Sequence, residues 1–228
     1  MTATCFIVLE GLDGAGKSVA AQALGAHFAA ALGECAATTY EPHNDMAAGG
    51  FIRQALAREF SASERVLALA YALNRADHND RVIQPFFAAA TTEASRVMVC
   101  DRYTLSSLVY QSSETQSMET IMALNGSARP PDSILFLDAD PEICAARIGT
   151  RGKSPELFDH DFAARRERYY EAMQFLRTRP TQNIGGRNAF TGQITVIDAN
   201  GTPDETLDRL LDALRPIAPA WLPTQIKT

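Results

Sequence analysis

The sequence contains no uninterrupted apolar stretch of the roughly 18 residues that a membrane-spanning helix needs, and no basic leader at its N-terminus. Its first residues run directly into Cys5–Leu9, a short apolar run that predicts a strand. Basic residues are fewer than acidic ones, 21 against 27, which gives a net charge of −6 and a pI of about 5.2. These features argue against a membrane partner and against broad nucleic-acid binding, and they predict a cytoplasmic protein.

Cysteine and histidine are also scarce, with four residues of each type. The cysteines form no Cys-x-x-Cys pair, and the histidines do not have the spacing of a metal site. We therefore expect reduced, mostly buried thiols and no zinc ion held by the protein.

The chain has 228 residues, of which 46% are hydrophobic and 21% charged, an ordinary balance for a globular protein. Short apolar runs of strand type alternate with helical patterns. The five predicted strands are Cys5–Leu9, Cys35–Tyr40, Val97–Cys100, Ile134–Leu137 and Ile194–Ile197. This alternation predicts an α/β protein of three layers, with a five-stranded parallel sheet covered by helices on both faces.

Helix signals lie between these strands. We expect an alanine-rich helix over 17–32 that ends in a left-handed cap at Gly33. We also expect a long helix that opens at the capping-box pattern Ser61–Glu64 and runs to about 90, broken or kinked at Pro85. Two further helices begin at Asp140-Pro141 and at the capping box Thr202–Glu205. Residues 1–215 form one predicted domain, with a long loop over 178–193 and a proline-rich, loose tail over 216–228.

The segment Gly11–Ser18 reads Gly-Leu-Asp-Gly-Ala-Gly-Lys-Ser and matches the phosphate-binding pattern GxxxxGK[ST] in full. It follows a predicted buried strand and opens a predicted helix, where backbone N–H groups and the helix dipole bind phosphate. Lys17 would reach the β- and γ-phosphates of ATP, and the Ser18 hydroxyl would bind Mg²⁺. The alternative is a glycine-rich turn that matches by chance.

Asp101 and Arg102 follow another predicted strand, at the sheet edge where parallel α/β proteins bind ligands. Asp101 could contribute to the Mg²⁺ shell, and Arg102 could hold phosphates. The alternative is an aspartate that caps the next helix and a solvated arginine.

Nearly the whole chain resembles the bacterial thymidylate kinases, which are P-loop nucleoside monophosphate kinases. The resemblance rests on Glu10–Ser18, on the DRY…SS…YQ pattern of Asp101–Gln111, and on Leu73–His78 with Tyr71 nearby. Segments 131–141 and 196–199 also match. The most specific of these matches is Asp101–Gln111.

The resemblance implies a P-loop kinase fold with a lid at about 147–160, and it implies roles for individual residues. The residues that it assigns to ATP and its phosphates are Gly11, Leu12, Asp13, Gly14, Ala15, Gly16, Lys17, Ser18, Val19 and Arg151. The residues that it assigns to dTMP are Asp13, Glu41, Arg53, Tyr71, Arg75, Arg102, Ser107, Tyr110 and Gln111. Within this set, Tyr71 would stack on thymine and Arg75 would hydrogen-bond the base. Arg53 and Arg102 would hold the acceptor phosphate. Tyr110 would close the 2′ side of the sugar, and Glu41 would lie near the 3′-hydroxyl. Asp13, Lys17 and Arg102 would be catalytic, and Ser18 and Asp101 would hold Mg²⁺, mainly through nucleotide and water.

The sequence departs from the family at two places. Glu41-Pro42 is followed by His43-Asn44 where the family has two glycines, and Tyr40 replaces an arginine. The lid lacks the family's arginine within an Asp-Arg-x-Glu run. Lys153 and Arg147 are the candidates for the missing cation, followed by Arg165 and Arg166, which could equally be part of a solvated face.

These observations predict a phosphotransferase that converts ATP and dTMP to ADP and dTDP, with Mg²⁺ as cofactor. The family also implies a homodimer that forms through long helices. Two other hypotheses remain: a deoxynucleoside kinase, which also carries Glu-Pro after its second strand, and a nucleotide-dependent switch that binds but does not phosphorylate a metabolite. An assay across dTMP, other monophosphates and thymidine distinguishes the three.

Overall fold

Five parallel strands form a single sheet in the computed structural model, which describes residues 4–91, 94–150, 156–158, 160–178, 192–216 and 222–224. The strands are β1 (Thr4–Gly11), β2 (Ala36–Tyr40), β3 (Arg96–Asp101), β4 (Ser133–Asp138) and β5 (Gln193–Asp198). Their order in the sheet is β2-β3-β1-β4-β5, and every neighbouring pair is parallel. The predicted α/β class and the five parallel strands are confirmed.

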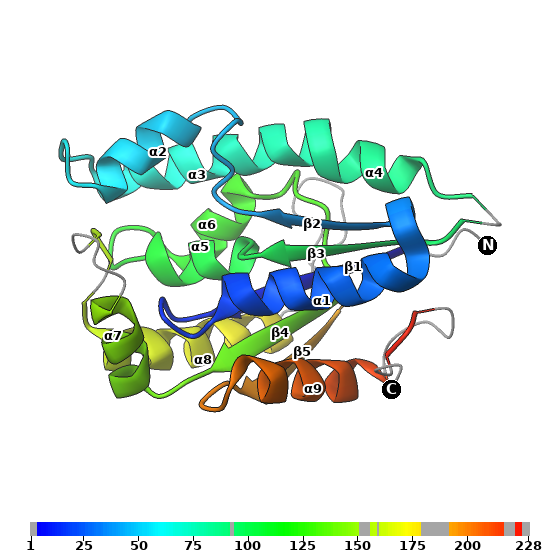
Figure 1. The fold of residues 1–228 in the computed structure, drawn as a ribbon. Coiled ribbons are helices and arrows are strands. Elements are labelled where there is room, and N and C mark those ends of the chain that lie inside the picture. The colour runs from blue at the N-terminus through cyan, green and yellow to red at the C-terminus, as the bar shows by residue number, and fades with distance from the viewer. Residues whose placement is uncertain are drawn as a thin grey trace.

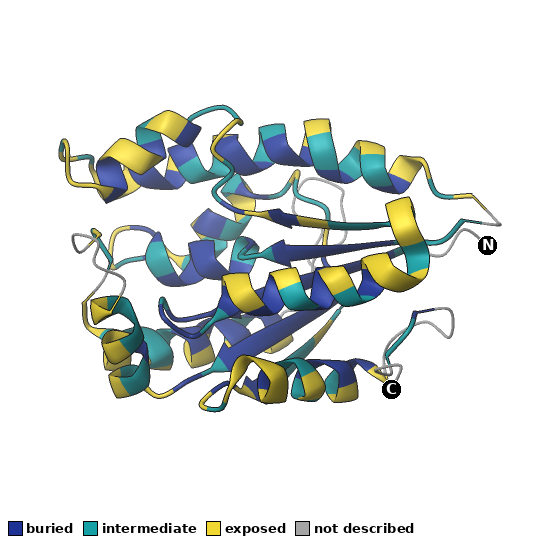
Figure 2. Cartoon of the chain, viewed as in Figure 1, coloured by how far each residue is buried: buried dark blue, intermediate teal, exposed yellow. Residues whose placement is uncertain are grey.

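The central strand explains why the sheet forms where the sequence predicts it. In β1, Phe6 to Leu9 are fully buried, because both faces of the strand are covered by helices. The strand pairs with β3 on one side, Cys5 opposite Val97, and with β4 on the other, Ile7 opposite Ser133. Figure 2 shows the central strands as the buried layer between helices with exposed outer faces.

Helices cover both faces of the sheet and extend beyond its β2 edge (Figure 1). They are α1 (Lys17–Leu32), α2 (Gly49–Leu56), α3 (Glu64–His78), α4 (Gln84–Ala88), α5 (Thr104–Tyr110), α6 (Met118–Leu124), α7 (Pro141–Gly149), α8 (Phe162–Thr178) and α9 (Pro203–Leu214). Helices α1 and α9 pack together on the face nearer the viewer, and α5 and α8 pack together behind the sheet. Helices α2, α3 and α4 run along the β2 side. None of the helices among the described residues is long and apolar enough to cross a membrane.

The predicted helix over 61–90 is a composite of three segments. Ser63, not Ser61, accepts the capping hydrogen bond, from the Val66 N–H, so the helix begins two residues later than the expected capping box. A π-helical turn over Asn79–Ile83 separates α3 from α4, and the Gln84 N–H donates to the Asn79 carbonyl. Pro85 lies directly after this turn. Since proline has no N–H to donate and its ring crowds the preceding turn, the regular α-helical ladder does not continue through this position.

Other local predictions are confirmed or refined. Helix α1 spans 17–32 as predicted, but Gly33 has φ 56° and ψ −131°, which is not the left-handed helical cap that we expected. The capping box at Thr202 and Glu205 is present. Pro141 begins α7, although the Asp140 side chain makes no capping hydrogen bond. The structure also contains helices α2, α5 and α6, whose seven or eight residues give too few turns for a clear periodic signal.

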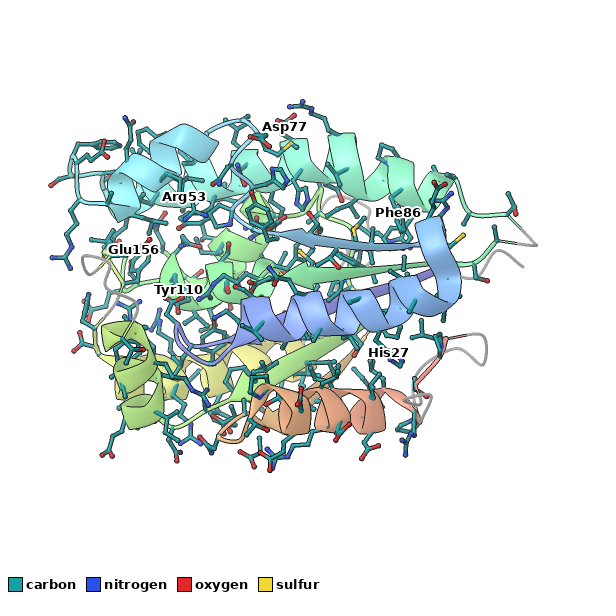
Figure 3. The ribbon with its side chains drawn as sticks, in the orientation of Figure 1. His27, Arg53, Asp77, Phe86, Tyr110 and Glu156 are labelled. Carbon is teal, nitrogen blue, oxygen red and sulfur yellow. The ribbon has the colours of Figure 1, made fainter. Side chains whose placement is uncertain are left out.

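The predicted loop over 178–193 lies outside the described residues except at its ends, where Thr178 closes α8 and Gln193 begins β5. Only part of the proline-rich tail is described. Within it, Leu222 is buried in the main core, and His27 Nε2 on α1 lies 3.0 Å from the Pro223 carbonyl oxygen. The described end of the tail is therefore held against α1, the helix whose His27 is labelled in Figure 3.

Candidate active site

The phosphate loop joins β1 to α1 at the carboxyl edge of the sheet. Gly14 and Gly16 have φ angles of 85° and 91°, a region that favours glycine. A Cβ at Gly14 would lie 2.4 Å from the Cys144 carbonyl oxygen, so the loop also has no room for a side chain there. The N-terminus of α1 is thus held open as a backbone anion site, as the motif predicts.

Lys17 lies inside this loop and is almost fully buried. Its Nζ donates to the Leu12 carbonyl at 2.7 Å and lies 3.9 Å from the Asp13 carboxylate. Burial, and secondarily the charge of Arg102, lower the pKa of Lys17 to about 8. A phosphate in the loop would supply the negative charge that this buried cation lacks.

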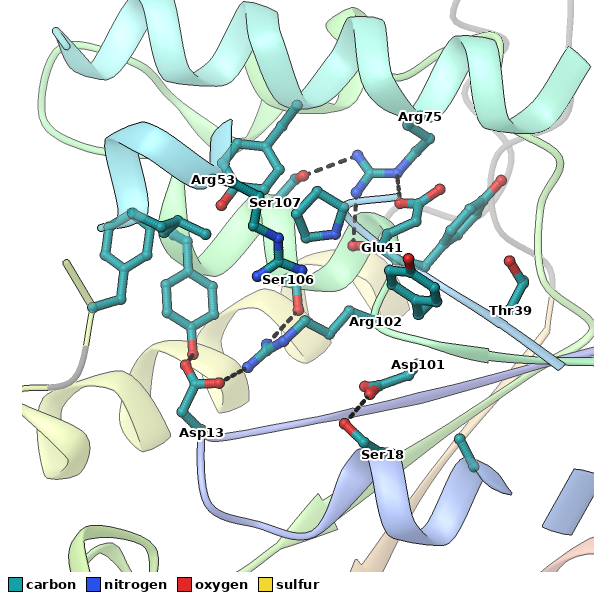
Figure 4. A pocket seen from close by; sticks show the side chains of 18 of the residues that line it. Asp13, Ser18, Thr39, Glu41, Arg53, Arg75, Asp101, Arg102, Ser106 and Ser107 are labelled. Atoms are coloured by element: carbon teal, nitrogen blue, oxygen red, sulfur yellow. Dashed lines mark hydrogen bonds and ion pairs between the residues drawn. The ribbon is translucent and has the colours of Figure 1, made fainter. Parts of the chain in front are cut away.

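Ser18 and Asp101 meet at the mouth of the loop, where the Ser18 hydroxyl donates to Asp101 Oδ2 at 2.5 Å (Figure 4). The other carboxylate oxygen, Oδ1, is buried and accepts no hydrogen bond from any described residue. Both groups line a small cavity of about 80 Å³ with the glycines of the loop and Lys17. A hydroxyl oxygen and a free carboxylate oxygen on a phosphate site are hard oxygen ligands, so these residues fit Mg²⁺.

Arg102 lies between the small cavity at the phosphate loop and a second, larger cavity beside it. Its backbone has a φ of 67°, which is rare for a residue with a side chain. The guanidinium pairs with Asp13 and donates to Ser106 Oγ at 2.9 Å and to the Tyr169 hydroxyl at 3.1 Å. Burial favours the neutral form of Asp13, but Arg102 and Lys17 outweigh it and lower the pKa of that carboxyl to about 2.

Glu10, near the end of β1, fixes the backbone at the start of α5, a role that the sequence did not reveal. It is completely buried, and its carboxylate accepts hydrogen bonds from the N–H groups of Tyr103 and Ser106 at 2.8 and 3.0 Å and from the Ser106 hydroxyl. Burial raises its pKa, whereas the bonds from Ser106 act in the opposite direction. Glu10 therefore anchors the start of α5, which carries the Ser106-Ser107 and Tyr110-Gln111 pairs.

A larger cavity of about 530 Å³ adjoins the phosphate loop (Figure 4). Every residue that the sequence assigned to dTMP lines it: Asp13, Glu41, Arg53, Tyr71, Arg75, Arg102, Ser107, Tyr110 and Gln111. These residues come from the phosphate loop, the segment after β2, α2, α3 and the β3–α5 region. The structure thus brings together groups that are up to about a hundred positions apart in the sequence.

Arg75 is held in this cavity wall by four hydrogen-bond partners. Its Nε donates to Glu41 Oε2 at 2.6 Å, Nη1 donates to Ser107 Oγ at 2.9 Å and to Asn125, and Nη2 donates to the Tyr103 carbonyl at 3.1 Å. Glu41 and Arg75 are both nearly inaccessible to solvent. The guanidinium plane is therefore fixed by side chains from several elements.

The segment after β2, in which His43 and Asn44 depart from the family pattern, is held by hydrogen bonds to α2 and α3. Asn74 on α3 accepts from the His43 N–H and donates to the carbonyls of His43 and Ala47, all within 2.9 Å. Asn44 accepts from Arg53 Nε at 2.7 Å. Asn44 thus orients a predicted phosphate-binding arginine, and neither asparagine was identified from the sequence as a functional residue.

Tyr71 and Tyr110 provide the aromatic surfaces of the cavity. The Tyr110 hydroxyl donates to Asp13 Oδ2 at 3.4 Å, and burial raises the pKa of Tyr110 to about 12. Burial also raises the pKa of Tyr71. Both phenols are therefore neutral at physiological pH and present an uncharged ring for stacking.

The described part of the lid closes one side of the same cavity. The Leu157 N–H donates to the Leu56 carbonyl at the end of α2, and the Phe158 ring lies 5.1 Å from the Tyr110 ring. Glu156 and Phe158 line the cavity, although the sequence did not indicate them. Figure 3 shows Glu156 and Tyr110 on this side of the molecule, near Arg53.

The candidate lid cations differ in their surroundings. Arg147 donates to the carbonyl oxygens of Gly14, Ala199 and Gly201 at 3.1 to 3.4 Å. Arg165 lies 5.1 Å from the ring centroids of both Tyr110 and Phe158, which line the cavity. Arg166 forms two bonds of 2.6 Å with Asp138. Arg151 and Lys153 lie outside the described residues, and Val19 is exposed on the first turn of α1.

Comparisons with known proteins agree with this geometry. The family model for thymidylate kinase matches residues 9–184. The chain is 32% identical to a thymidylate kinase of Synechococcus sp. (strain JA-3-3Ab) over 224 residues, 96% of this chain and 98% of the relative. It is 33% identical to a probable thymidylate kinase of Caldivirga maquilingensis over 207 residues, 90% and 91% of the two chains.

Solved structures show the same fold. Thymidylate kinase from Candida albicans superposes with a TM-score of 0.69 at 22% identity and covers 95% of this chain and 93% of its own. Thymidylate kinase from Ehrlichia chaffeensis gives a TM-score of 0.64 at 18% identity, covering 93% and 99%. The chain therefore belongs to the thymidylate kinase family, whose members are kinases that phosphorylate dTMP.

Proposed function

We propose that this chain transfers the γ-phosphate of ATP to dTMP, with Mg²⁺ bound at the junction of Ser18 and Asp101. The observation that supports this most directly is the shared wall between the two cavities. Asp13, Ser18, Asp101 and Arg102 line both the small cavity at the phosphate loop and the large cavity beside it. A phosphate donor and a phosphate acceptor bound in these cavities would meet at Arg102.

On the donor side, the amides of Gly11–Ser18 and the Lys17 ammonium bind the phosphates of ATP. Val19 lies on the first turn of α1, and Arg151, which is outside the described residues, would bind the adenine as the family resemblance implies. Bound Mg²⁺ would neutralise charge on the β- and γ-phosphate oxygens. Asp101 Oδ1 and Ser18 Oγ are the protein oxygens that would face it.

On the acceptor side, Tyr71 stacks on the base and Arg75, Ser107 and Gln111 face its polar edge. Arg53 and Arg102 hold the acceptor phosphate, and Tyr110 packs against the 2′ side of the sugar. Asp13 helps to position the acceptor and the metal, and Glu41 lies near the 3′-hydroxyl of the sugar. An attacking phosphate oxygen is already anionic, so no general base is required. The rate therefore depends on alignment and on neutralisation of charge in a site from which water is excluded.

Substrate selection tests the proposal. We expect a coupled ADP-release assay to rank dTMP above dUMP, with dCMP and UMP poorer and thymidine inactive. Thymidine lacks the phosphate that Arg53 and Arg102 would hold, and the 2′-hydroxyl of UMP would crowd Tyr110. One methyl group distinguishes dUMP from dTMP, and such a difference gives only about 10- to 200-fold discrimination. Faster turnover of thymidine would favour a deoxynucleoside kinase, and nucleotide binding without turnover of any acceptor would favour a regulatory switch.

We also propose that the chain forms a homodimer through α3. Val66, Leu69 and Leu73 are 45 to 54% exposed and recur at the spacing of one helix face. The opposite face of α3 carries Tyr71 and Arg75, so dimerisation would leave the cavity accessible. In sedimentation experiments, Leu69→Asp should shift the protein to monomer, whereas Val196→Asp on the exposed edge strand β5 should not. A monomeric wild type would contradict the proposal.

A further inference from the structure

His78 lies behind the wall of the larger cavity and is completely buried. Its Nδ1 is 3.0 Å from Glu41 Oε1, and its Nε2 is 2.7 Å from the Thr39 hydroxyl. Thr39 and Glu41 line the cavity, whereas His78 does not. The histidine therefore has no direct access to an acceptor and can act on it only through its partners.

These two contacts specify where the imidazole carries its proton. An ionised carboxylate can only accept hydrogen bonds, so Nδ1 must be the donor toward Glu41. Nε2 of a neutral ring then accepts the hydrogen of the Thr39 hydroxyl. Glu41 thus fixes the tautomer, the Nδ1–H holds one oxygen of Glu41, and Thr39 donates to the ring nitrogen that this tautomer leaves as acceptor.

The same chain of contacts continues into the base-binding region. The other Glu41 oxygen accepts from Arg75 Nε. An arginine has five N–H groups, and Arg75 directs one to Glu41, two from Nη1 to Ser107 and Asn125, and one from Nη2 to Tyr103. This leaves one N–H on Nη2 for a group in the cavity.

We propose that His78 is a positioning residue that sets the base selectivity of the acceptor site through Glu41 and Arg75. By holding Glu41, His78 fixes the angle at which Arg75 presents its remaining N–H to the cavity. A guanidinium donates and never accepts, so a fixed donor favours a base with a carbonyl at this position, as in thymine, over one with an amino group, as in cytosine. The inference rests on the proposed function, because it requires the base to lie beside Arg75.

Loss of His78 would matter because each carboxylate oxygen of Glu41 has a different donor, His78 for Oε1 and Arg75 for Oε2. Without His78, Oε1 would be buried without its donor, and the carboxylate could rotate and exchange oxygens toward Arg75. The guanidinium could then tilt and accommodate an amino group as readily as a carbonyl. Selectivity for the base should fall more than the ability to bind ATP, which is built by the phosphate loop.

Two substitutions of similar size separate the two contacts of His78. The amide nitrogen of asparagine can occupy the place of Nδ1, so His78→Asn can keep a donor to Glu41. Glutamine reaches the place of Nε2, so His78→Gln keeps only a partner for Thr39. Asn79→Ala is the matched control, because Asn79 is equally buried in the adjacent position but bonds to residues 127 and 129, away from the cavity.

The measurement is the ratio of kcat/KM for dTMP to that for dCMP, with the KM for ATP recorded in parallel. We expect His78→Gln to lower the ratio by about tenfold or more, since a misplaced donor forfeits the discrimination that a hydrogen bond gives. His78→Asn and Asn79→Ala should stay within about threefold of wild type, and the KM for ATP should remain unchanged in all three.

An unchanged ratio in His78→Gln would overturn the inference, as would an equal loss in both His78 variants. If His78→Gln does not fold, His78→Leu provides the test, because it fills similar space but carries no donor for Glu41 Oε1. A lowered ratio in that variant supports the inference, and an unchanged ratio overturns it. Wild-type turnover of dTMP is scored separately, so failure of the proposed function is distinguishable from failure of the inference.

Discussion

The two sides of the proposed site are built in different ways. The donor side is one continuous segment, 11–18, in which backbone N–H groups and a single lysine would bind the phosphates. The acceptor side gathers side chains from the β2–α2 loop, α2, α3 and α5, and fixes them through buried contacts such as Glu41–Arg75. One side depends on local backbone conformation, and the other depends on a network that exists only in the folded chain.

The difference predicts on which side of the site a substitution that lowers activity also lowers the free energy of unfolding. Removing a side chain from the phosphate loop leaves its backbone cradle intact. Removing a member of the acceptor network leaves a buried polar partner without its hydrogen bonds, which destabilises the fold as well as the site.

Lys17→Ala should have the largest effect on activity and little effect on folding. Loss of a cation that neutralises the transferring phosphate should lower kcat by about 10² to 10³. The free energy of unfolding should not fall, because burial already disfavours the charge of Lys17. Steady-state kinetics and urea denaturation measure the two effects, and turnover within a few-fold of wild type would contradict the donor-side assignment.

Arg75→Met should show the opposite pattern, with a large effect on folding. The substitution leaves the Glu41 carboxylate as an uncompensated buried charge, and we expect a loss of about 3 kcal/mol in the free energy of unfolding. Adding Glu41→Gln should restore part of this stability, because the double variant removes both charges. If the double variant is no more stable than the single one, the pair does not couple as the structure indicates.

Replacement of the lid cation should have an intermediate effect on turnover. We expect Lys153→Ala to lower kcat by about 10- to 100-fold with little change in ATP affinity, because the contact would form mainly in the transition state. Arg147→Ala should instead lower the melting temperature, since its guanidinium donates to three backbone carbonyls. If neither variant lowers kcat, Arg165→Ala is the next test, because that guanidinium lies over Tyr110 and Phe158, two rings of the cavity wall.

The smallest expected effect concerns pH and again separates the two sides. Lys17 has a pKa lowered to about 8, so it loses its proton as the pH rises through this value, and binding of ATP phosphates must restore the charge. ATP affinity should therefore be about tenfold weaker at pH 9 than at pH 7, as proton linkage requires. Affinity for dTMP should stay constant from pH 7.5 to 9, because neither Asp13 nor Arg102 titrates in this range. The pKa of Asp13 is about 2. Burial disfavours the charge of Arg102, but the carboxylate of Asp13 outweighs burial and raises the pKa of Arg102 well above its usual value.

The Lys17→Arg variant is the control for this pH dependence. Arginine remains charged over the whole range, so any ATP binding that it retains should be independent of pH between 7 and 9. A similar decline in Lys17→Arg and wild type would show that another group titrates.

Much of the fold was predictable because it is encoded in short segments. The continuous apolar run of β1 and the glycines and lysine that follow it specify a strand, a loop and a helix without reference to the rest of the chain. The capping box at Thr202 and Glu205 fixes the start of α9 in the same local way. By contrast, the use of Ser63 rather than Ser61 as the cap, and the π-helical turn before Pro85, have no such local signal, and α3 packs against α2 and α6, which are distant in the sequence or absent from the prediction.

For the site, the sequence named the residues but not their partners. The resemblance assigned Arg75 and Glu41 separately, and only the fold shows that they bind each other and are supported by His78 and Asn125. The roles given to individual residues, the lid cation and the dimer stay predictions. Glu10, Tyr169 and Asn74 had no sequence signal beyond their neighbours, because their function is to hold other side chains.

The sequence by itself determined the phosphate loop and its place in a parallel α/β sheet, because both depend on consecutive residues and on the periodicity of buried strands. Tertiary structure alone decided which of the scattered arginines face a cavity and which are held elsewhere. Arg165 and Arg166 are neighbours in the sequence, yet one lies over the rings of Tyr110 and Phe158 and the other is bound to Asp138. Adjacent positions on a helix point in different directions, so their environments are set by the elements that pack against each face.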